Sequence, residues 1–132
     1  MNSQQLLAHF DNGLYWSQPI SATQGYDTNA AYRDALAVRD LRIARGEIPR
    51  GYKIGFTNRT IWTRYNVFGP IWGTVWNTTL TFCSGSQNLS LNAICQPRIE
   101  PEIVFGLRKP QNQMQPLKIS TNLWDGLPLG LR

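Results

Sequence analysis

The sequence predicts an α+β domain in which helices near the N-terminus precede a group of strands. A segment with helical spacing of apolar residues runs from about 28 to 45. It is followed by short runs rich in β-branched and aromatic residues, the clearest of them at 50–56, 71–76 and 99–107. The chain has 132 residues, enough for one domain with a core of its own.

Two helices are expected in the first 50 residues. The first covers 3–10 and ends before Gly13. The second is capped by Thr28 or Asn29 and ends at Gly46, which is typical of the residue after a helix. Its apolar stripe consists of Ala31, Ala35, Val38 and Leu41, and the spacing of Arg39, Arg42 and Arg45 predicts a solvated helix face.

The expected strands follow in the second half of the chain. The run 50–56 ends in a turn at 57–58, and 59–66 fits a short helix. Pro70 opens a strand over Ile71–Trp76, and further strands are expected at 78–83 and 99–107. The composition changes after Leu107, where three prolines and no sustained period predict a loop or tail over 108–132.

Composition narrows the class of protein. The net charge is +5, but the basic residues are scattered and form no dense block, which argues against a nucleic-acid-binding protein. No apolar run approaches the length of a membrane span, and the N-terminus lacks the features of a signal peptide. We therefore expect a soluble, cytoplasmic protein. Cys83 and Cys95 match no zinc motif and are expected to be buried free thiols, with a disulfide between them as the alternative. The single histidine, His9, is expected to be a partly buried helix residue.

A pair of carboxylates stands in the last expected strand. Glu100 and Glu102 are two residues apart in PRIEPEIVFGL, so a strand would place both on one face. Two neighbouring carboxylates in an apolar strand repel each other, and a divalent cation would stabilise them. Oxygen ligands favour magnesium or manganese over zinc. The alternative is a solvent-facing edge strand with two surface glutamates.

An isolated lysine stands between two glycines in the stretch GYKIG. As a functional residue, Lys53 would hold an anionic substrate or move a proton near a metal. Gly51 and Gly55 would allow a ligand to approach the backbone closely. The alternative is a lysine that points to water while Tyr52 and Ile54 point inward.

Three stretches, in this order, resemble the fumarylacetoacetate hydrolase superfamily, in particular its 2-keto-4-pentenoate hydratase and 2-oxo-acid decarboxylase branch. The stretches are AYRDALAVRDLRIARGEIPRGYKIGFTN, GPIWGTVW and QPRIEPEIVFGL. The resemblance covers roughly residues 5–107, and the combination of GYKIG with a later P-R-x-E-x-E-I is its most specific part.

The resemblance implies a fold, a metal and an activity. The fold would be a mixed, curved β-sheet after N-terminal helices, incomplete here because the chain is short. Glu100 and Glu102 would bind Mg²⁺ or Mn²⁺, Lys53 would be catalytic, and Gly51, Gly55 and Gly73 would line the substrate site.

The substrate implied is a 2-hydroxydienoic or 2-oxo-enoic acid from the breakdown of aromatic compounds, and the metal would stabilise its enolate. The reaction would be hydration by a cytoplasmic homo-oligomer. Decarboxylation of a 2-oxo acid, or an inactive truncated chain, are the alternatives.

Two features depart from the family pattern. Ile71 stands in Pro70-Ile71-Trp72-Gly73, where many hydratases of this branch carry an acidic residue. A third acidic ligand would lie some thirty residues beyond the glutamate pair, and Asp125 is the single acidic residue there, in a stretch unlike that of the family. We therefore expect residues 1–107 to be the N-terminal part of a hydratase-like domain and 108–132 to be a truncated or frame-altered tail.

Overall fold

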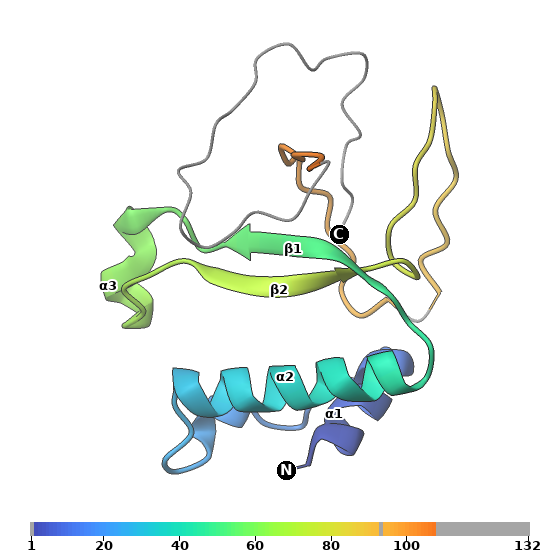
Figure 1. Cartoon of the computed structure of the whole chain (residues 1–132). Coiled ribbons are helices and arrows are strands. Elements are labelled where there is room, and N and C mark those ends of the chain that lie inside the picture. Colours follow the sequence, from blue (N-terminus) through green and yellow to red (C-terminus); the bar gives the residue numbers. More distant parts are fainter. Residues whose placement is uncertain (1, 93, 108–132) are drawn as a thin grey trace. The chain divides into compact units, whose positions relative to one another are not determined.

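The computed structural model describes residues 2–92 and 94–107 of the chain (Figure 1). They belong to two units. The first consists of Met1–Thr81 with Ser90–Cys95, and the second begins with Phe82–Leu89 and continues from Gln96. Every helix and strand of the described residues lies in the first unit, so this unit carries the fold.

The first helix, α1, spans Ser3–Asp11 and is closed at its start by a reciprocal cap. The Asn2 side chain accepts a hydrogen bond from the Gln5 N–H at 2.9 Å, and the Gln5 side chain accepts one from the Asn2 N–H at 3.2 Å. The His9 ring is half-buried and stacks on the Trp16 ring, with centroids 3.7 Å apart. The prediction of a partly buried helix residue at His9 is thus confirmed.

The long helix, α2, spans Thr28–Ala44, after a short 3₁₀ turn, η1, at Ile20–Ala22. Its cap is Asp27, whose carboxylate accepts from the Ala30 N–H at 2.7 Å, so the predicted cap at Thr28 or Asn29 was one or two residues late. Gly46 has a φ of +95°, and the Glu47 N–H donates to the Arg42 carbonyl at 3.0 Å. This is a Schellman ending, and it confirms the predicted stop at Gly46.

Two antiparallel strands form the sheet of the described residues. β1 spans Pro49–Gly55 and β2 spans Ile71–Trp76. The connection contains a 3₁₀ turn, η2, at Arg59–Ile61 and one helical turn, α3, at Trp62–Tyr65, where the sequence predicts a short helix. The indole N–H of Trp62 donates to the Phe56 carbonyl at 2.9 Å and fastens this connection to the end of β1.

Two predicted strands are not formed. Residues 78–83 are a turn followed by irregular chain, and 99–107 have no regular secondary structure. Pro101 lies within the second of these runs, where it cannot donate to a ladder, and neither run has a strand partner among the described residues. The α+β class is confirmed, but the sheet of the described part is small and antiparallel, and the curved, mixed sheet of the family remains a prediction.

Few side chains are buried in the described part. Its buried apolar residues are Leu7 of α1 and Trp76 of β2, and its buried charged residues are Arg42 and Glu47. The prediction of a solvated arginine face is therefore wrong at Arg42, which is 6% exposed. Positions 31, 35, 38 and 42 follow one helical stripe, so Arg42 extends the apolar face toward Trp76.

The two cysteines are free, as predicted, but both are exposed rather than buried. Both lie in segments without helix or strand. None of the helices in the described part is long and apolar enough to cross a membrane.

Candidate active site

Lys53 stands on a face of the hairpin that is otherwise built largely of glycine. The ladder pairs Lys53 with Gly73, Gly51 with Val75 and Gly55 with Ile71. Side chains directly opposite each other in an antiparallel pair lie on the same face, and so do residues two apart on one strand. The three predicted substrate-site glycines therefore surround Lys53.

The orientation of Lys53 is the reverse of the solvent-facing alternative. Lys53 is half-buried, whereas its neighbours Tyr52 and Ile54 are 65% and 63% exposed. Tyr52 and Ile54 pair with Thr74 and Trp72 on the opposite face of the hairpin.

The glycines of this face leave space that side chains would otherwise fill. A Cβ atom built on Gly51 or Gly73 would meet no atom within 4 Å among the described residues beyond its chain neighbours. Neither residue has a positive φ, so the backbone does not require glycine there. What glycine provides at these two positions is an open surface beside the lysine.

Ile71 lies on the same face as Lys53. It pairs with Gly55, two positions along the ladder from the Lys53–Gly73 pair. Diagonal neighbours of this kind have Cα atoms about 7–8 Å apart, which is within the reach of a long side chain. The position where many hydratases of this branch carry a carboxylate is thus beside the lysine, and this chain places an aliphatic side chain there.

Glu100 and Glu102 belong to the second unit, in irregular chain. Both are half-buried, while the flanking Ile99 and Ile103 are 83% and 72% exposed. Each glutamate takes part in an interaction. The predicted shared strand face is wrong because residues 99–107 form no strand.

Glu100 and Glu102 have the oxygen ligands that Mg²⁺ prefers, but they are only two carboxylates. Two carboxylates offer hard oxygen donors, and Mg²⁺ is commonly held by one or two carboxylates with water and substrate completing its shell. Within residues 2–92 and 94–107, no group of three or more His, Cys, Asp and Glu side chains could hold a metal. The predicted candidate for a third ligand, Asp125, lies outside the described residues.

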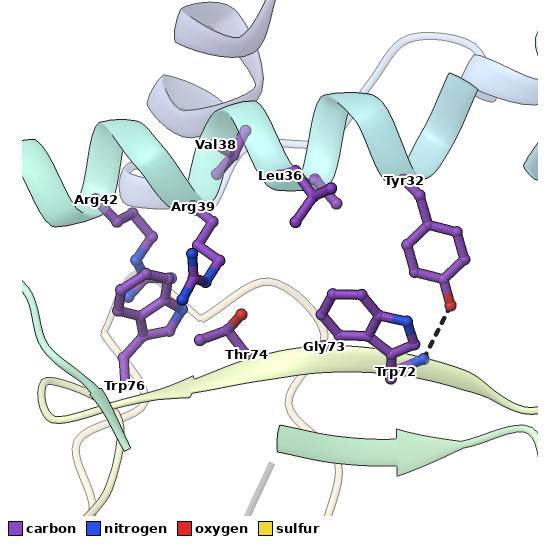
Figure 2. A pocket seen from close by; sticks show the side chains of 10 residues that line it. Tyr32, Leu36, Val38, Arg39, Arg42, Trp72, Gly73, Thr74 and Trp76 are labelled. Carbon is purple, nitrogen blue, oxygen red and sulfur yellow. Dashed lines mark hydrogen bonds between the residues drawn. The ribbon is translucent and has the colours of Figure 1, made fainter. Parts of the chain in front are cut away.

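The other face of the hairpin packs against α2. Trp72, Thr74 and Trp76 of β2 point toward the helix (Figure 2). The Trp72 ring stacks on the Tyr32 ring at a centroid distance of 5.3 Å, and the Trp72 N–H donates to the Tyr32 hydroxyl at 3.0 Å. This contact fixes β2 on the helix and turns the Lys53 face away from it.

A buried ion pair fixes the other end of the hairpin. Glu47 accepts hydrogen bonds from Arg42 Nε at 2.9 Å and from the Thr78 hydroxyl at 2.6 Å. The Arg42 guanidinium also lies 4.5 Å from the centre of the Trp76 ring. Arg45 donates both to Glu47 and to Asp11 of α1, so the cluster joins both helices to the strands.

The electrostatics of this cluster favour the ionised carboxylate. Burial by itself raises the pKa of Glu47, but the hydrogen bonds from Arg42, Thr78 and Arg45 outweigh it and lower the pKa to about 2. The helical stripe shared by Arg42 and Val38 was a signal in the sequence for this burial, but no local pattern indicated Glu47 as its partner.

Comparison with known proteins finds a relative that is named as a hydratase. The chain is 32% identical over 89 residues to a 2-hydroxypent-2,4-dienoate hydratase of Pseudomonas putida. The match covers 66% of this chain and 40% of the relative, so the chain spans well under half of that relative's length. No family model and no solved structure matches significantly.

The comparison agrees with the motifs. The stretches that carry Lys53 and the glutamate pair resemble the hydratase branch, and the matched relative has a hydratase name. The N-terminal part of this chain is therefore related by sequence to the hydratase branch of the fumarylacetoacetate hydrolase superfamily.

Proposed function

We propose that this chain carries the lysine side of a hydratase active site for 2-hydroxydienoic or 2-oxo-enoic acids from aromatic-compound breakdown. The observation that supports this most is the Lys53 face: a half-buried lysine directly opposite Gly73, with open space at Gly51 and Gly73. The hydratase name of the matched relative supports the reaction class.

Lys53 would act on the carboxylate end of the substrate. Its ammonium group is a compact cation that can hold a carboxylate and, in a desolvated site, exchange a proton. The glycine surface beside it would admit a flat, conjugated acid close to the backbone. Water would add across the distal double bond of 2-hydroxypenta-2,4-dienoate and give 4-hydroxy-2-oxopentanoate, with the enol proton returned to carbon.

We further propose that Glu100 and Glu102 hold Mg²⁺ or Mn²⁺. Such an ion, when bound, would supply the positive charge that stabilises an oxyanion on the 2-oxygen of a 2-oxo acid. With two carboxylates as its protein ligands, the site would bind Mg²⁺ weakly, because this ion gives up its water reluctantly.

Calorimetric titration of the full chain with Mg²⁺ and Mn²⁺ tests the metal site. Binding that is lost in the double variant Glu100→Gln/Glu102→Gln and kept in Asp40→Asn supports it; Asp40 is an exposed carboxylate elsewhere in the first unit. Equal binding by the two variants, or none by the native chain, would exclude a metal site at these glutamates.

Turnover tests the reaction. Loss of the ultraviolet absorption of the dienoate is expected with the native chain, and Lys53→Met is expected to lower the rate at least about a hundredfold, as removal of an acid–base group does. Arg50→Met is the matched control, because Arg50 is an exposed cation on the same strand. Release of carbon dioxide from a 2-oxo acid would favour the decarboxylase alternative.

A chain without activity of its own is the second candidate. It is favoured by the length of the relative, of which this chain matches 40%, and by the absence of any side chain less than 2% exposed among the described residues. A stable chain that turns over neither substrate, while a full-length hydratase does so under the same conditions, would support this candidate over the enzyme.

A further inference from the structure

A cavity of about 100 Å³ lies between α2 and β2 (Figure 2). The strand register places it on the face of the hairpin opposite Lys53. Its helix side includes Tyr32, Leu36 and Arg39, and its strand side is formed by Trp72, Gly73, Thr74 and Trp76. All of these residues belong to the first unit. The volume is of the order of a single aromatic ring with a small substituent.

The cavity carries an uncompensated positive charge. Its lining contains two arginines and no carboxylate. Arg42 is neutralised by its buried ion pair with Glu47. Arg39 is half-buried, points toward the strand in Figure 2, and has neither a hydrogen bond nor an ion pair among the described residues. A partly desolvated guanidinium in such a place favours an anion, above all a carboxylate that can accept two hydrogen bonds.

The walls of the cavity are flat and aromatic. Trp72 and Trp76 are four residues apart on β2, so their indole rings stand on one face with Thr74 between them. Tyr32 stacks on the Trp72 ring on the side of the helix, and Leu36 adds an aliphatic surface. The Thr74 hydroxyl makes no hydrogen bond within the described part and is available as a polar contact.

From this combination we propose that the cavity between α2 and β2 is a binding site for a small, planar monocarboxylate, with Arg39 as its anion contact and the two indoles as its walls. An aromatic ring or a conjugated chain fits between aromatic side chains, and a single cation matches a single carboxylate. Strand alternation places Lys53 on the other face, so this ligand would not contact Lys53, although Gly73 borders both sites.

Benzoate is the probe for this site, followed by tryptophan fluorescence and calorimetry on the full chain. We expect saturable binding with a dissociation constant of roughly millimolar, as is usual for a ligand of this size. Arg39→Gln should weaken binding about tenfold or more, because it removes a charge-assisted hydrogen bond. Arg33→Gln removes the same charge from an exposed position of α2 and should leave binding within about twofold of the native value.

Two further measurements distinguish binding at this cavity from a folding defect in the Arg39→Gln variant and from binding at the Lys53 site. Benzamide has the ring without the charge, and the native chain should bind it at least about tenfold more weakly than benzoate. Lys53→Met should bind benzoate as the native chain does, even if it has lost all hydratase activity. Absence of saturable benzoate binding, equal weakening by Arg39→Gln and Arg33→Gln, equal affinity for benzamide, or loss of binding in Lys53→Met would each overturn the proposal.

Discussion

Lys53 and Gly73 stand directly opposite each other in the ladder of β1 and β2. A slip of one residue in this register would move every side chain of β1 to the other face of the hairpin and would place Lys53 against α2. The register is held at one end by the contact between Tyr32 and Trp72, and at the other by the Arg42–Glu47 cluster. The lysine face therefore depends on packing that lies on the far side of the sheet.

Gly73→Val should separate the role of Gly73 in function from its role in stability. Valine favours strands, and a Cβ at this position meets no atom within 4 Å, so the melting temperature should stay the same or rise. The added side chain would fill the space beside Lys53, so turnover of the dienoate should fall at least about tenfold. Thermal unfolding and the hydration assay on one preparation check both parts, with Gly69→Ala as a control outside the strands. Unchanged turnover would show that substrate does not use this face.

Ile71→Asp would restore an acidic side chain beside Lys53. Ile71 is 45% exposed, so the substitution should cost no more than about 1 kcal/mol in the free energy of unfolding. If a carboxylate there handles a proton during hydration, the variant should turn over the dienoate faster than the native chain by about tenfold or more. Ile71→Asn has nearly the same shape without the charge and should give no increase. A gain of equal size in both variants would refute the proton role.

Stability should fall in acid because of Glu47. Its pKa is lowered from 4.5 to about 2 in the folded chain, so its contribution is complete above about pH 4.5 and is lost as the pH falls toward 2. Urea unfolding across this range should show that the free energy of unfolding declines by the order of 1–3 kcal/mol, which is typical of a buried charged hydrogen bond. Glu47→Gln should remove most of the decline, whereas Asp40→Asn should retain it. An identical acid profile for Glu47→Gln and the native chain would contradict this assignment.

Arg42→Met should lower the free energy of unfolding strongly, although methionine is a long, unbranched side chain like arginine. It leaves the Glu47 carboxylate buried beside Thr78 without its main cation, and breaking one partner of a buried pair costs about 3–5 kcal/mol. The double variant Arg42→Met/Glu47→Gln should recover a large part of this loss, because no charge remains buried. Chemical unfolding of the two variants measures the difference. If the double variant is no more stable than Arg42→Met, the loss is one of packing on Trp76 and not of charge pairing.

The sequence predicted correctly those helix ends and strands that are determined by the residues within them. Gly46 ends α2 because its positive φ suits glycine, and the strand over Ile71–Trp76 has the bounds that its β-branched and aromatic residues indicated. The run 99–107 has similar residues but forms no strand, because a strand also needs a partner and Pro101 interrupts its donors. The spacing of Arg42 fits a solvated charged face, but Arg42 also lies on the apolar stripe of α2, and the packing against Trp76 follows the stripe.

The sequence by itself determined that this chain has a capped long helix, an isolated lysine between glycines, a pair of glutamates, and motifs of the hydratase branch. Only the tertiary structure decided that Lys53 is half-buried opposite Gly73 while Tyr52 and Ile54 are exposed, and that Arg39 borders a cavity. The physical reason is that alternation along a strand fixes which residues share a face, but not which face is covered. α2 covers the β2 part of the face opposite Lys53, through Tyr32 on Trp72 and Arg42 on Trp76. These residues are forty and thirty-four positions apart in the chain, so no local pattern encodes the contact.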